Sequence, residues 1–345
     1  MIRSLVYDLH VMPFPPPRRN RQWLVAELPT SQLGQEHFRF VTADRPVPRD
    51  GELLIAVRLI SIDAANRAWM QGLTYRSALS DGEVMAGLAI GEVVESRVDG
   101  FAPGDLVFGD FGWQDFAVVA ADAVTMQPDD VPIERLLSLY GTSVLTAYHG
   151  LIDIGGLRAG DTLVVSAAGG SVGTAVGQIG RLLGARVVGI AGGADKGRWL
   201  VDVLGFAAAL DYRDPGFPAA LRALGGVDVY FDNVGGEILD RVLFAMNEGG
   251  RIVCCGAVAS YDGDKPRHGP RGVPGLLVTK RLTMRGFVVT DFQADRERAL
   301  QAIRDWVAQG KLRAIEDIVD GLEGAPAALI DQLAGRSRGK KMVRL

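Results

Sequence analysis

The sequence predicts an α/β protein with two domains, a partly closed β-barrel followed by a doubly wound parallel sheet. Three observations predict this. The chain has 345 residues, which is enough to bury two separate cores. Short strand-like segments separated by Gly and Pro turns occupy the first third, a pattern typical of a barrel. From Ile133 onward, helical and strand-like segments alternate, which indicates a parallel sheet covered by helices.

The barrel domain is expected over residues 18–127, after an N-terminal extension of residues 1–17. The apolar part of this extension is too short for a signal peptide and is broken by Asp8 and His10. Turns such as Pro103-Gly104-Asp105 punctuate the domain. The strand-like segments between the turns are Gln22–Ala26, Phe38–Thr42, Glu52–Ile62, Ala89–Val94, Leu106–Gly109 and Phe116–Val119.

A strand–turn–helix–strand unit from Asp161 to Ile190 lies at the centre of the second domain. An apolar run, Thr162–Ser166, leads into a turn in which Ala168, Gly170 and Gly173 have the spacing A-x-G-x-x-G. Small residues let a pyrophosphate approach the free N–H groups at a helix N-terminus, and Gly173 lets the helix pack closely on the strand. The unit therefore predicts a dinucleotide site; the alternative is a glycine-rich turn that binds no ligand.

The remaining elements complete the sheet, expected over residues 128–294, and a C-terminal return to the first domain over residues 295–345. Because parallel strands place their carboxyl ends at one edge, the ligand cleft should lie at that edge, between the domains. The expected helices are Leu136–Ile152, Ile238–Met246, Arg296–Gln309 and Ala325–Leu333, and the expected strands are Val187–Ile190, Leu210–Tyr212, Val229–Asp232, Ile252–Cys255 and Ile315–Val319, with one more at the C-terminus.

The residues after the second strand of the sheet favour NADP over NAD. An NAD site places an acidic residue there to bind the ribose hydroxyls, but the sequence reads Ile190-Ala191-Gly192-Gly193. Lys196 follows, with Arg198 nearby, and a cation at this point suits the 2′-phosphate of NADP. Asp195 is expected to cap the helix that contains Lys196.

Composition and charge exclude several classes of protein. A formal net charge of −4 argues against nucleic-acid or anionic-membrane partners, and no apolar run approaches membrane-spanning length. The two cysteines, Cys254 and Cys255, are adjacent, which makes them poor disulfide partners and suits the cytoplasm. No set of zinc ligands is evident, so we expect no catalytic metal. The four histidines, expected to be surface or packing residues, are His10, His37, His149 and His268.

Seven further segments carry a family resemblance: FGWQDFAV (111–118), LTAYHGL (145–151), SAAGGSVGTAVGQIG (166–180), VVGIAGGADKGRWL (187–200), FDNVGGEILD (231–240), GGRIVCCGAVASYD (249–262) and FVVTDF (287–292). Through them the chain resembles the zinc-independent medium-chain dehydrogenases/reductases. It is most similar to the prostaglandin reductase/leukotriene dehydrogenase branch, which includes alkenal double-bond reductases and curcumin reductase. This resemblance runs from about Arg18 to Leu345.

The resemblance implies a GroES-like catalytic domain, a Rossmann domain and a homodimer. It also implies that NADPH reduces the C=C bond of an α,β-unsaturated aldehyde or ketone, without zinc, by hydride transfer to the β-carbon. Tyr261 is then the catalytic candidate, hydrogen-bonding near the nicotinamide ribose and the substrate carbonyl. The implied cofactor contacts are Gly170, Ser171, Val172 and Gly173 for the pyrophosphate, Lys196 and Tyr212 for the 2′-phosphate, Thr146 and Asn233 for hydroxyl or pyrophosphate groups, and Cys255, Gly256, Tyr261, Phe287, Val288 and Val289 around the ribose and nicotinamide.

Two segments depart from the family pattern. The family's C-terminal G-x-N-x-G-K reads Gly335-Arg336-Ser337-Arg338-Gly339-Lys340, so that Ser337 offers a hydroxyl in place of an amide at one cofactor contact. The family's D-P-Y-M-R reads Asp63-Ala64-Ala65-Asn66-Arg67, which removes a bulky aromatic residue from the substrate side. The family's best-known substrates are therefore not assumed for this chain.

Alternative functions stay open at this point. The same scaffold also supports NADPH-dependent quinone reduction, and the dehydrogenase name of the branch implies alcohol oxidation. From another class, the chain is compatible with a non-catalytic NADPH-binding protein. Tyr261 is compatible with a purely structural role, and protonation of the substrate α-carbon is assigned to water because the sequence offers no evident strong acid.

Overall fold

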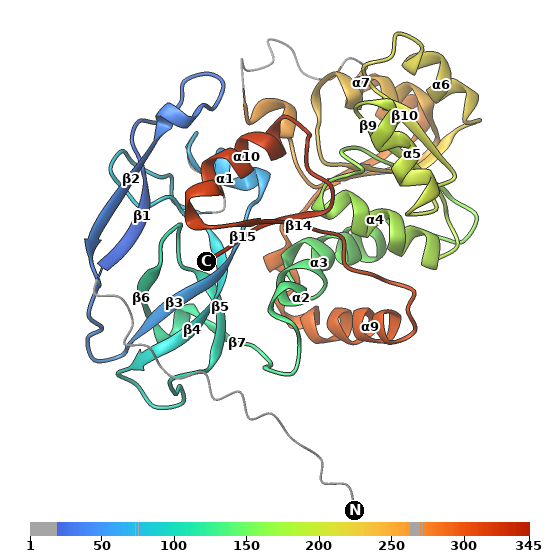
Figure 1. Ribbon diagram of the computed structural model, residues 1–345. Coiled ribbons are helices and arrows are strands. Elements are labelled where there is room, and N and C mark those ends of the chain that lie inside the picture. Colours follow the sequence, from blue (N-terminus) through green and yellow to red (C-terminus); the bar gives the residue numbers. More distant parts are fainter. Residues whose placement is uncertain (1–18, 73, 75, 263–269, 271) are drawn as a thin grey trace, which may run out of the picture.

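The computed structural model describes residues 19–72, 74, 76–262, 270 and 272–345 (Figure 1). The predicted N-terminal extension therefore lies outside the described residues. The first domain contains an antiparallel ribbon and a larger sheet, in which β3 pairs with both β4 and β6. Its elements are β1 (Arg19–Val25), β2 (Phe38–Asp44), β3 (Glu52–Ser61), α1 (Ala64–Trp69), β4 (Leu88–Ser96), β5 (Leu106–Asp110), β6 (Phe116–Ala120) and β7 (Thr125–Met126).

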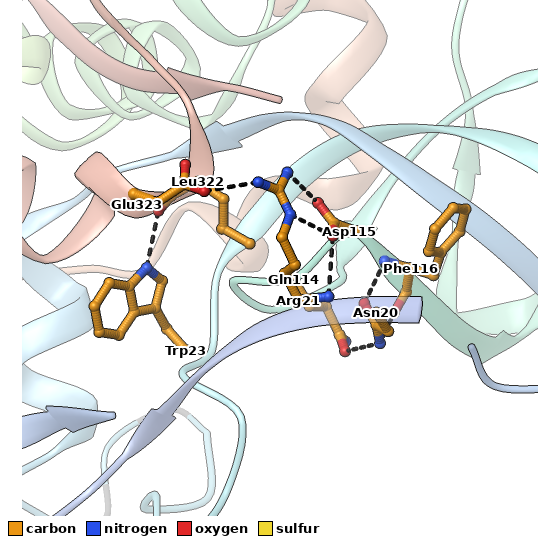
Figure 2. A network of polar contacts seen from close by, with 8 residues as sticks. All are labelled: Asn20, Arg21, Trp23, Gln114, Asp115, Phe116, Leu322 and Glu323. Carbon is orange, nitrogen blue, oxygen red and sulfur yellow. Dashed lines mark hydrogen bonds and ion pairs between the residues drawn. The ribbon is translucent and has the colours of Figure 1, made fainter. Parts of the chain in front are cut away.

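A polar network ties β1 to β6 and to the C-terminal part of the chain (Figure 2). The guanidinium of Arg21 donates two hydrogen bonds to the carboxylate of Asp115, at 2.9 and 3.0 Å, and a third to Glu323 at 2.7 Å. The hydrogen bond to Asp115 is the main cause of a raised Arg21 pKa, against the opposing effect of burial. The indole of Trp23 donates to the carbonyl of Leu322 at 2.9 Å. These bonds connect β1, near the start of the described chain, to Asp115 just before β6 and to Leu322 and Glu323 near the end of the chain.

The second domain is built on a six-stranded parallel sheet in the order β10-β9-β8-β11-β12-β13. Chain order reverses between β8 and β11, which is the switch point of a Rossmann fold and the position where such sheets bind ligands. The strands are β8 (Thr162–Val165), β9 (Arg186–Ala191), β10 (Ala208–Asp211), β11 (Val227–Asp232), β12 (Met246–Cys254) and β13 (Thr283–Gly286). The doubly wound sheet predicted from the sequence is confirmed.

Helices cover both faces of this sheet because successive strand residues point to opposite sides. Leu163 and Val165 of β8 belong to a core cluster with α3 (Thr142–His149), α4 (Ser171–Leu182) and α5 (Ala194–Asp202). Val164, between them, belongs to the cluster on the other face, with α6 (Phe217–Ala223) and α7 (Gly236–Ala245). α8 (Gly275–Lys280) precedes the edge strand β13.

The single helix expected over Leu136–Ile152 is wrong. The structure has α2 (Ile133–Ser138), then α3, then a π turn over Gly150–Ile154. The helix is interrupted at Gly141, where a Cβ atom would lie 2.4 Å from the carbonyl oxygen of Leu137. Apolar periodicity continues across this break, which is why the sequence pattern did not reveal it.

After β13 the chain contributes to both domains. α9 (Arg296–Ala308) buries Ala299, Leu300 and Ile303 in the cluster that contains α3 and α4. β14 (Glu316–Asp320) pairs with β15 (Lys340–Arg344), and β15 pairs antiparallel with β3 of the first domain. α10 (Ala325–Leu333) lies beside α1 (Figure 1). The strand pairing between this C-terminal segment and the first domain is thus made after α9, while the division at residues 127, 294 and 295 stays a prediction. Within the described residues no helix is long and apolar enough to cross a membrane.

Candidate active site

Most of the predicted site residues follow the ends of six parallel strands and therefore lie along one edge of the sheet; Thr146 lies within α3, and Ser337 precedes β15. The glycine-rich turn follows β8, Lys196 follows β9, Tyr212 follows β10 and Asn233 follows β11. Cys255, Gly256 and Tyr261 come after β12, and Phe287 to Val289 come after β13. Strand pairing thus assembles residues from six separate segments, as a ligand lying across the switch point requires.

The turn after β8 leaves room and donors for an anion. Ala167 adopts a positive φ of 48°, and Gly170 is the N-cap residue of α4. A Cβ atom at Gly173 would lie 2.3 Å from the carbonyl oxygen of Ala167, so only glycine fits there. The N–H groups of Val172 and Gly173 in the first turn of α4 have no acceptor among the described residues, as expected of a helix N-terminus, whereas the N-cap residue Gly170 is bridged to Gly339 of the C-terminal loop. Free N–H groups and the helix dipole favour a phosphate at this point.

A buried carboxylate fixes the loop after β11, and the sequence analysis missed it. Asp232 is 2% exposed, and its Oδ1 accepts hydrogen bonds from the Ser166 and Tyr230 hydroxyls and from the N–H groups of Val234 and Gly235, at 2.8–3.1 Å. Burial, and next the Asp232 charge, raises the pKa of Tyr230 well above its usual value. The only available signal was an Asp at the end of an apolar strand.

Asn233, predicted as a cofactor contact, also anchors the turn after β8. Its side-chain amide donates to the Ser166 carbonyl at 2.8 Å, and its backbone N–H donates to the Ser166 hydroxyl at 2.9 Å. The Asn233 carbonyl lies so close to the loop after β12 that a Cβ atom at Gly256 would be 3.0 Å from its oxygen. Asn233 therefore holds together the loops on both sides of the switch point.

A group of cations gathers where the 2′-phosphate of NADP is predicted. Lys196 donates to the carbonyls of Gly335 and Ser337, at 2.5 and 2.8 Å. Burial, together with the nearby charges of Arg338 and Arg213, lowers the pKa of Lys196. Tyr212 is 42% exposed, and the guanidinium of Arg213 lies over its ring, 5.4 Å from the centroid. Sequence reasoning missed Arg213 and Arg338, which come to Lys196 from two distant segments.

The helix that carries Lys196 is not capped by Asp195, contrary to expectation. Gly193 is the N-cap residue of α5, with a φ of 87°. Asp195 lies in the first turn of α5, where the helix dipole stabilises a negative charge, and it pairs with Arg198. Arg198 thus has a carboxylate partner on its own helix, while Lys196 lies near Arg213 and Arg338 at the point where the 2′-phosphate is predicted.

The C-terminal loop closes over the glycine-rich turn. The N–H group of Gly339 donates to the Gly169 carbonyl at 2.8 Å, and the buried hydroxyl of Ser337 has no hydrogen-bond partner. An orphaned buried hydroxyl beside free helix N–H groups and three cations fits a ligand that carries several phosphate groups. The residues present thus fit NADPH, including Ser337 at the position where the family pattern has Asn.

The loop with Tyr261 is held against the first domain. The Tyr261 hydroxyl accepts a hydrogen bond from the Ala257 N–H group at 3.2 Å, and the Tyr261 carbonyl accepts one from the Gln71 side chain at 2.8 Å. The next residue, Asp262, accepts hydrogen bonds from Arg67 at 3.2 Å and from the Leu33 N–H group at 2.7 Å. Arg67 is 1% exposed. The segment that departs from the family pattern thus still carries an arginine that fixes the Tyr261 loop.

The remaining predicted contacts differ in how far their polar atoms are available. The Thr146 hydroxyl donates to the Thr142 carbonyl within α3, at 2.8 Å. The Val288 N–H group donates to Asp291 at 3.1 Å.

Burial raises the pKa of Cys254 to about 11 and that of Cys255 to about 12. Both thiols are therefore protonated at neutral pH and are poor nucleophiles.

Among the described residues, no group of three or more His, Cys, Asp or Glu side chains is arranged so that it could hold a metal ion. His10 and His268 lie outside the described residues. His37 is partly buried and contacts the backbone of Gly34 through Nδ1. His149 is buried, and its Nδ1 lies 2.8 Å from Asp153.

Comparisons with known proteins agree with this architecture. Residues 21–126 match the family model described as the N-terminal domain of oxidoreductase, and residues 171–305 match the model described as zinc-binding dehydrogenase. The chain is 38% identical to the NADPH-dependent curcumin reductase of Escherichia coli (strain K12), covering 95% of this chain and 97% of the relative. It is 34% identical to the NADP(+)-dependent 2-alkenal reductase of Nicotiana tabacum, covering 88% and 90%.

Among solved structures, CurA from Vibrio vulnificus in complex with NADPH is similar, with a TM-score of 0.89 and 36% identity. The match covers 94% of this chain and 98% of that one. The chain therefore belongs to the medium-chain dehydrogenase/reductase family, in its zinc-independent branch of reductases.

Proposed function

We propose that the protein uses NADPH to reduce the C=C bond of α,β-unsaturated aldehydes or ketones. The observation that carries the proposal is the edge of the sheet, where free N–H groups, the orphaned Ser337 hydroxyl and the Lys196 group of cations converge. This arrangement suits a pyrophosphate joined to a 2′-phosphate. The names of the curcumin and 2-alkenal relatives support the reaction class.

In the proposed reaction the cofactor, when bound, supplies the hydride, which adds to the β-carbon of the substrate. Negative charge then develops on the substrate oxygen, and the hydroxyl of Tyr261 is the group assigned to donate a hydrogen bond to it. Phe287, Val288 and Val289 line the nicotinamide side, and Cys255 and Gly256 the opposite loop. Water provides the proton that adds to the α-carbon.

A cofactor and substrate panel tests the proposal. NADPH oxidation is followed at its absorbance band with enals, enones and quinones, and each assay is repeated with NADH. Turnover of enals or enones with NADPH, and much slower turnover with NADH, is the expected result. Turnover of quinones alone would replace this reaction by quinone reduction. Tight NADPH binding without turnover of any acceptor would leave a non-catalytic binding protein.

Replacing Lys196 by alanine is expected to raise the KM for NADPH about tenfold or more. A hydrogen bond to a charged group contributes about 1.5–3 kcal/mol, and each 1.4 kcal/mol corresponds to about tenfold in affinity. Because Lys196 also holds the C-terminal loop, Arg213→Gln serves as the matched variant that removes a cation without touching that loop. Both variants should raise the KM for NADPH more than that for NADH. An equal rise for both cofactors in Arg213→Gln would refute the 2′-phosphate role.

Replacing Tyr261 by phenylalanine is expected to lower kcat by about tenfold or more, because it removes the donor assigned to the developing charge. The ring and its packing remain, so the KM for NADPH should change little. Steady-state kinetics with an enone measure both quantities. An unchanged kcat would remove Tyr261 from the mechanism and leave it a structural role.

We further propose that the protein is a cytoplasmic homodimer. Its two cysteines are free, which suits a reducing compartment. β13 is an edge strand of the parallel sheet, and the nearby Phe244 and Val278 are 61% and 73% exposed. Light scattering of the full chain should give twice the monomer mass, and Val278→Asp should lower it. A monomeric mass at micromolar concentration would contradict the dimer.

A further inference from the structure

Two adjacent buried lysines at the start of β15 pair with carboxylates in different parts of the molecule. The side chain of Lys340 is 4% exposed, and its Nζ lies 2.6 Å from Oδ1 of Asp63, the N-cap residue of α1 in the first domain. The side chain of Lys341 is 9% exposed, and its Nζ lies 2.9 Å from Oδ1 of Asp317 in β14, the strand beside β15. Of the two pairs, that of Lys340 alone joins the C-terminal segment to α1.

The backbone at Lys340 is fixed against the glycine-rich turn. The N–H group of the preceding residue, Gly339, donates to the Gly169 carbonyl at 2.8 Å, and Gly339 is bridged to Gly170, the N-cap residue of α4. The N–H group of Lys340 itself donates to the carbonyl of Ile315 at 2.7 Å. The main chain of this segment thus adjoins the predicted pyrophosphate site, while the Lys340 side chain extends to the first domain.

Asp63 is held in place within the first domain. Its second carboxylate oxygen, Oδ2, accepts a hydrogen bond from the Ser61 hydroxyl, and its N–H group donates to the side-chain oxygen of Asn66 at 2.7 Å. Asn66, where the family pattern has Met, is 1% exposed, and its amide donates to the Ala86 carbonyl at 2.9 Å. The start of α1 therefore has a defined position and presents a defined carboxylate to Lys340.

The other end of α1 holds the Tyr261 loop. Arg67, within α1, donates to the carboxylate of Asp262 at 3.2 Å. Gln71, just after α1, donates to the Tyr261 carbonyl at 2.8 Å. Because α1 has six residues, its start and Arg67 are less than one turn apart, and a shift of the start also displaces Arg67. A continuous series of contacts thus runs from the glycine-rich turn through Lys340 and α1 to the Tyr261 loop.

We propose that Lys340 is a positioning residue, which through Asp63 and α1 determines where the Tyr261 hydroxyl lies relative to the cofactor. The inference rests on the proposed function, which gives Tyr261 its role. A misplacement of about 1 Å can lower a reaction rate about 100-fold, so a small displacement of the Tyr261 loop has a large effect. A buried ion pair is suited to this task, because displacing one partner leaves the other charge buried and uncompensated.

Two matched double variants test the proposal by the single-turnover rate of enone reduction at saturating NADPH. Lys340→Met with Asp63→Asn removes both charges and leaves at position 63 a side chain that can still cap α1. The rate should fall about tenfold, while the KM for NADPH should change little, because Lys196 and the α4 N–H groups are untouched.

Lys341→Met with Asp317→Asn is the matched control, since it removes a pair of similar burial that does not reach α1. Its single-turnover rate should equal that of the wild type. Saturating NADPH keeps the effect of the Asp317 charge on Lys196 out of the comparison. An unchanged rate in the Lys340 double variant, or an equal fall in both double variants, would overturn the positioning role.

Amide hydrogen exchange keeps this proposal separate from the proposed function, because it requires no turnover. Residues 257–262 should exchange faster in the Lys340 double variant than in the wild type, and at the wild-type rate in the Lys341 double variant. If no enone is reduced but exchange shows this difference, the proposed reaction is wrong and the contact from Lys340 to the Tyr261 loop is supported. Unchanged exchange over 257–262 in the Lys340 double variant would overturn the positioning role, even if the rate of reduction falls.

Discussion

Replacing Asp232 by alanine is expected to lower the free energy of unfolding by at least about 3 kcal/mol. One oxygen of this buried carboxylate accepts hydrogen bonds from two hydroxyls and two N–H groups. Each buried donor left without a partner costs about 1–3 kcal/mol. Urea unfolding followed by tryptophan fluorescence measures the loss. Because Ser166 and the loop after β11 border the switch point, NADPH affinity should fall as well.

Asp232→Asn is the matched control for this experiment. The amide oxygen of asparagine can take the place of Oδ1 and accept the same four hydrogen bonds, although the negative charge is lost. Asp232→Asn should therefore be clearly more stable than Asp232→Ala. Equal stability of the two variants would show that the hydrogen bonds to Oδ1 do not hold the loop.

Replacing Asp262 by alanine is expected to destabilise the protein by about 3–5 kcal/mol, because it leaves the buried guanidinium of Arg67 without its carboxylate. The side chains of Arg67 and Asp262 are 1% and 16% exposed. Asp44→Ala breaks a comparable pair with Arg19, in which the side chains are 64% and 89% exposed, and should cost no more than about 1 kcal/mol. Thermal unfolding of both variants measures the difference.

The same pair is expected to affect turnover because Asp262 directly follows Tyr261. The double variant Arg67→Met, Asp262→Leu removes both charges, so much of the lost stability should return. Its kcat should nevertheless stay low, since the Tyr261 loop then loses its bonds to Arg67 and Leu33 and keeps the weaker attachment through the Gln71 side chain. Recovery of kcat together with stability would show that the pair contributes to folding alone.

Much of the architecture was accessible from the sequence because its signals are local. Apolar periodicity identified thirteen of the fifteen strands in the described residues and most of the helices, in most cases to within a few residues. The elements that were missed carry too few periodic residues to be recognised: the short helices α1, α6 and α8 and the short strands β7 and β13. The break at Gly141 was also missed, because it depends on contact with a carbonyl one turn earlier and not on a change in apolar pattern.

The candidate site likewise has features that are local in the sequence and features that depend on contacts between distant residues. The glycine-rich turn and the missing acid after β9 are local, and the sequence identified both. Arg213 and Arg338 were missed because their significance arises only from their closeness to Lys196. His149 was expected to be a packing or surface residue, and in the structure it is buried and stacks on Phe292.

By itself, the sequence determined the two-domain fold, the family resemblance, the dinucleotide turn and the preference for a 2′-phosphate. These follow from spacing within single segments, where neighbouring residues fix the backbone. Only the tertiary structure decided which distant groups meet. Lys196 reaches the carbonyl of Gly335, 139 residues away, and Arg67 reaches Asp262, 195 residues away. Such contacts depend on how the strands are ordered and how the chain returns to β3, and these long-range pairings leave no periodic trace in the sequence.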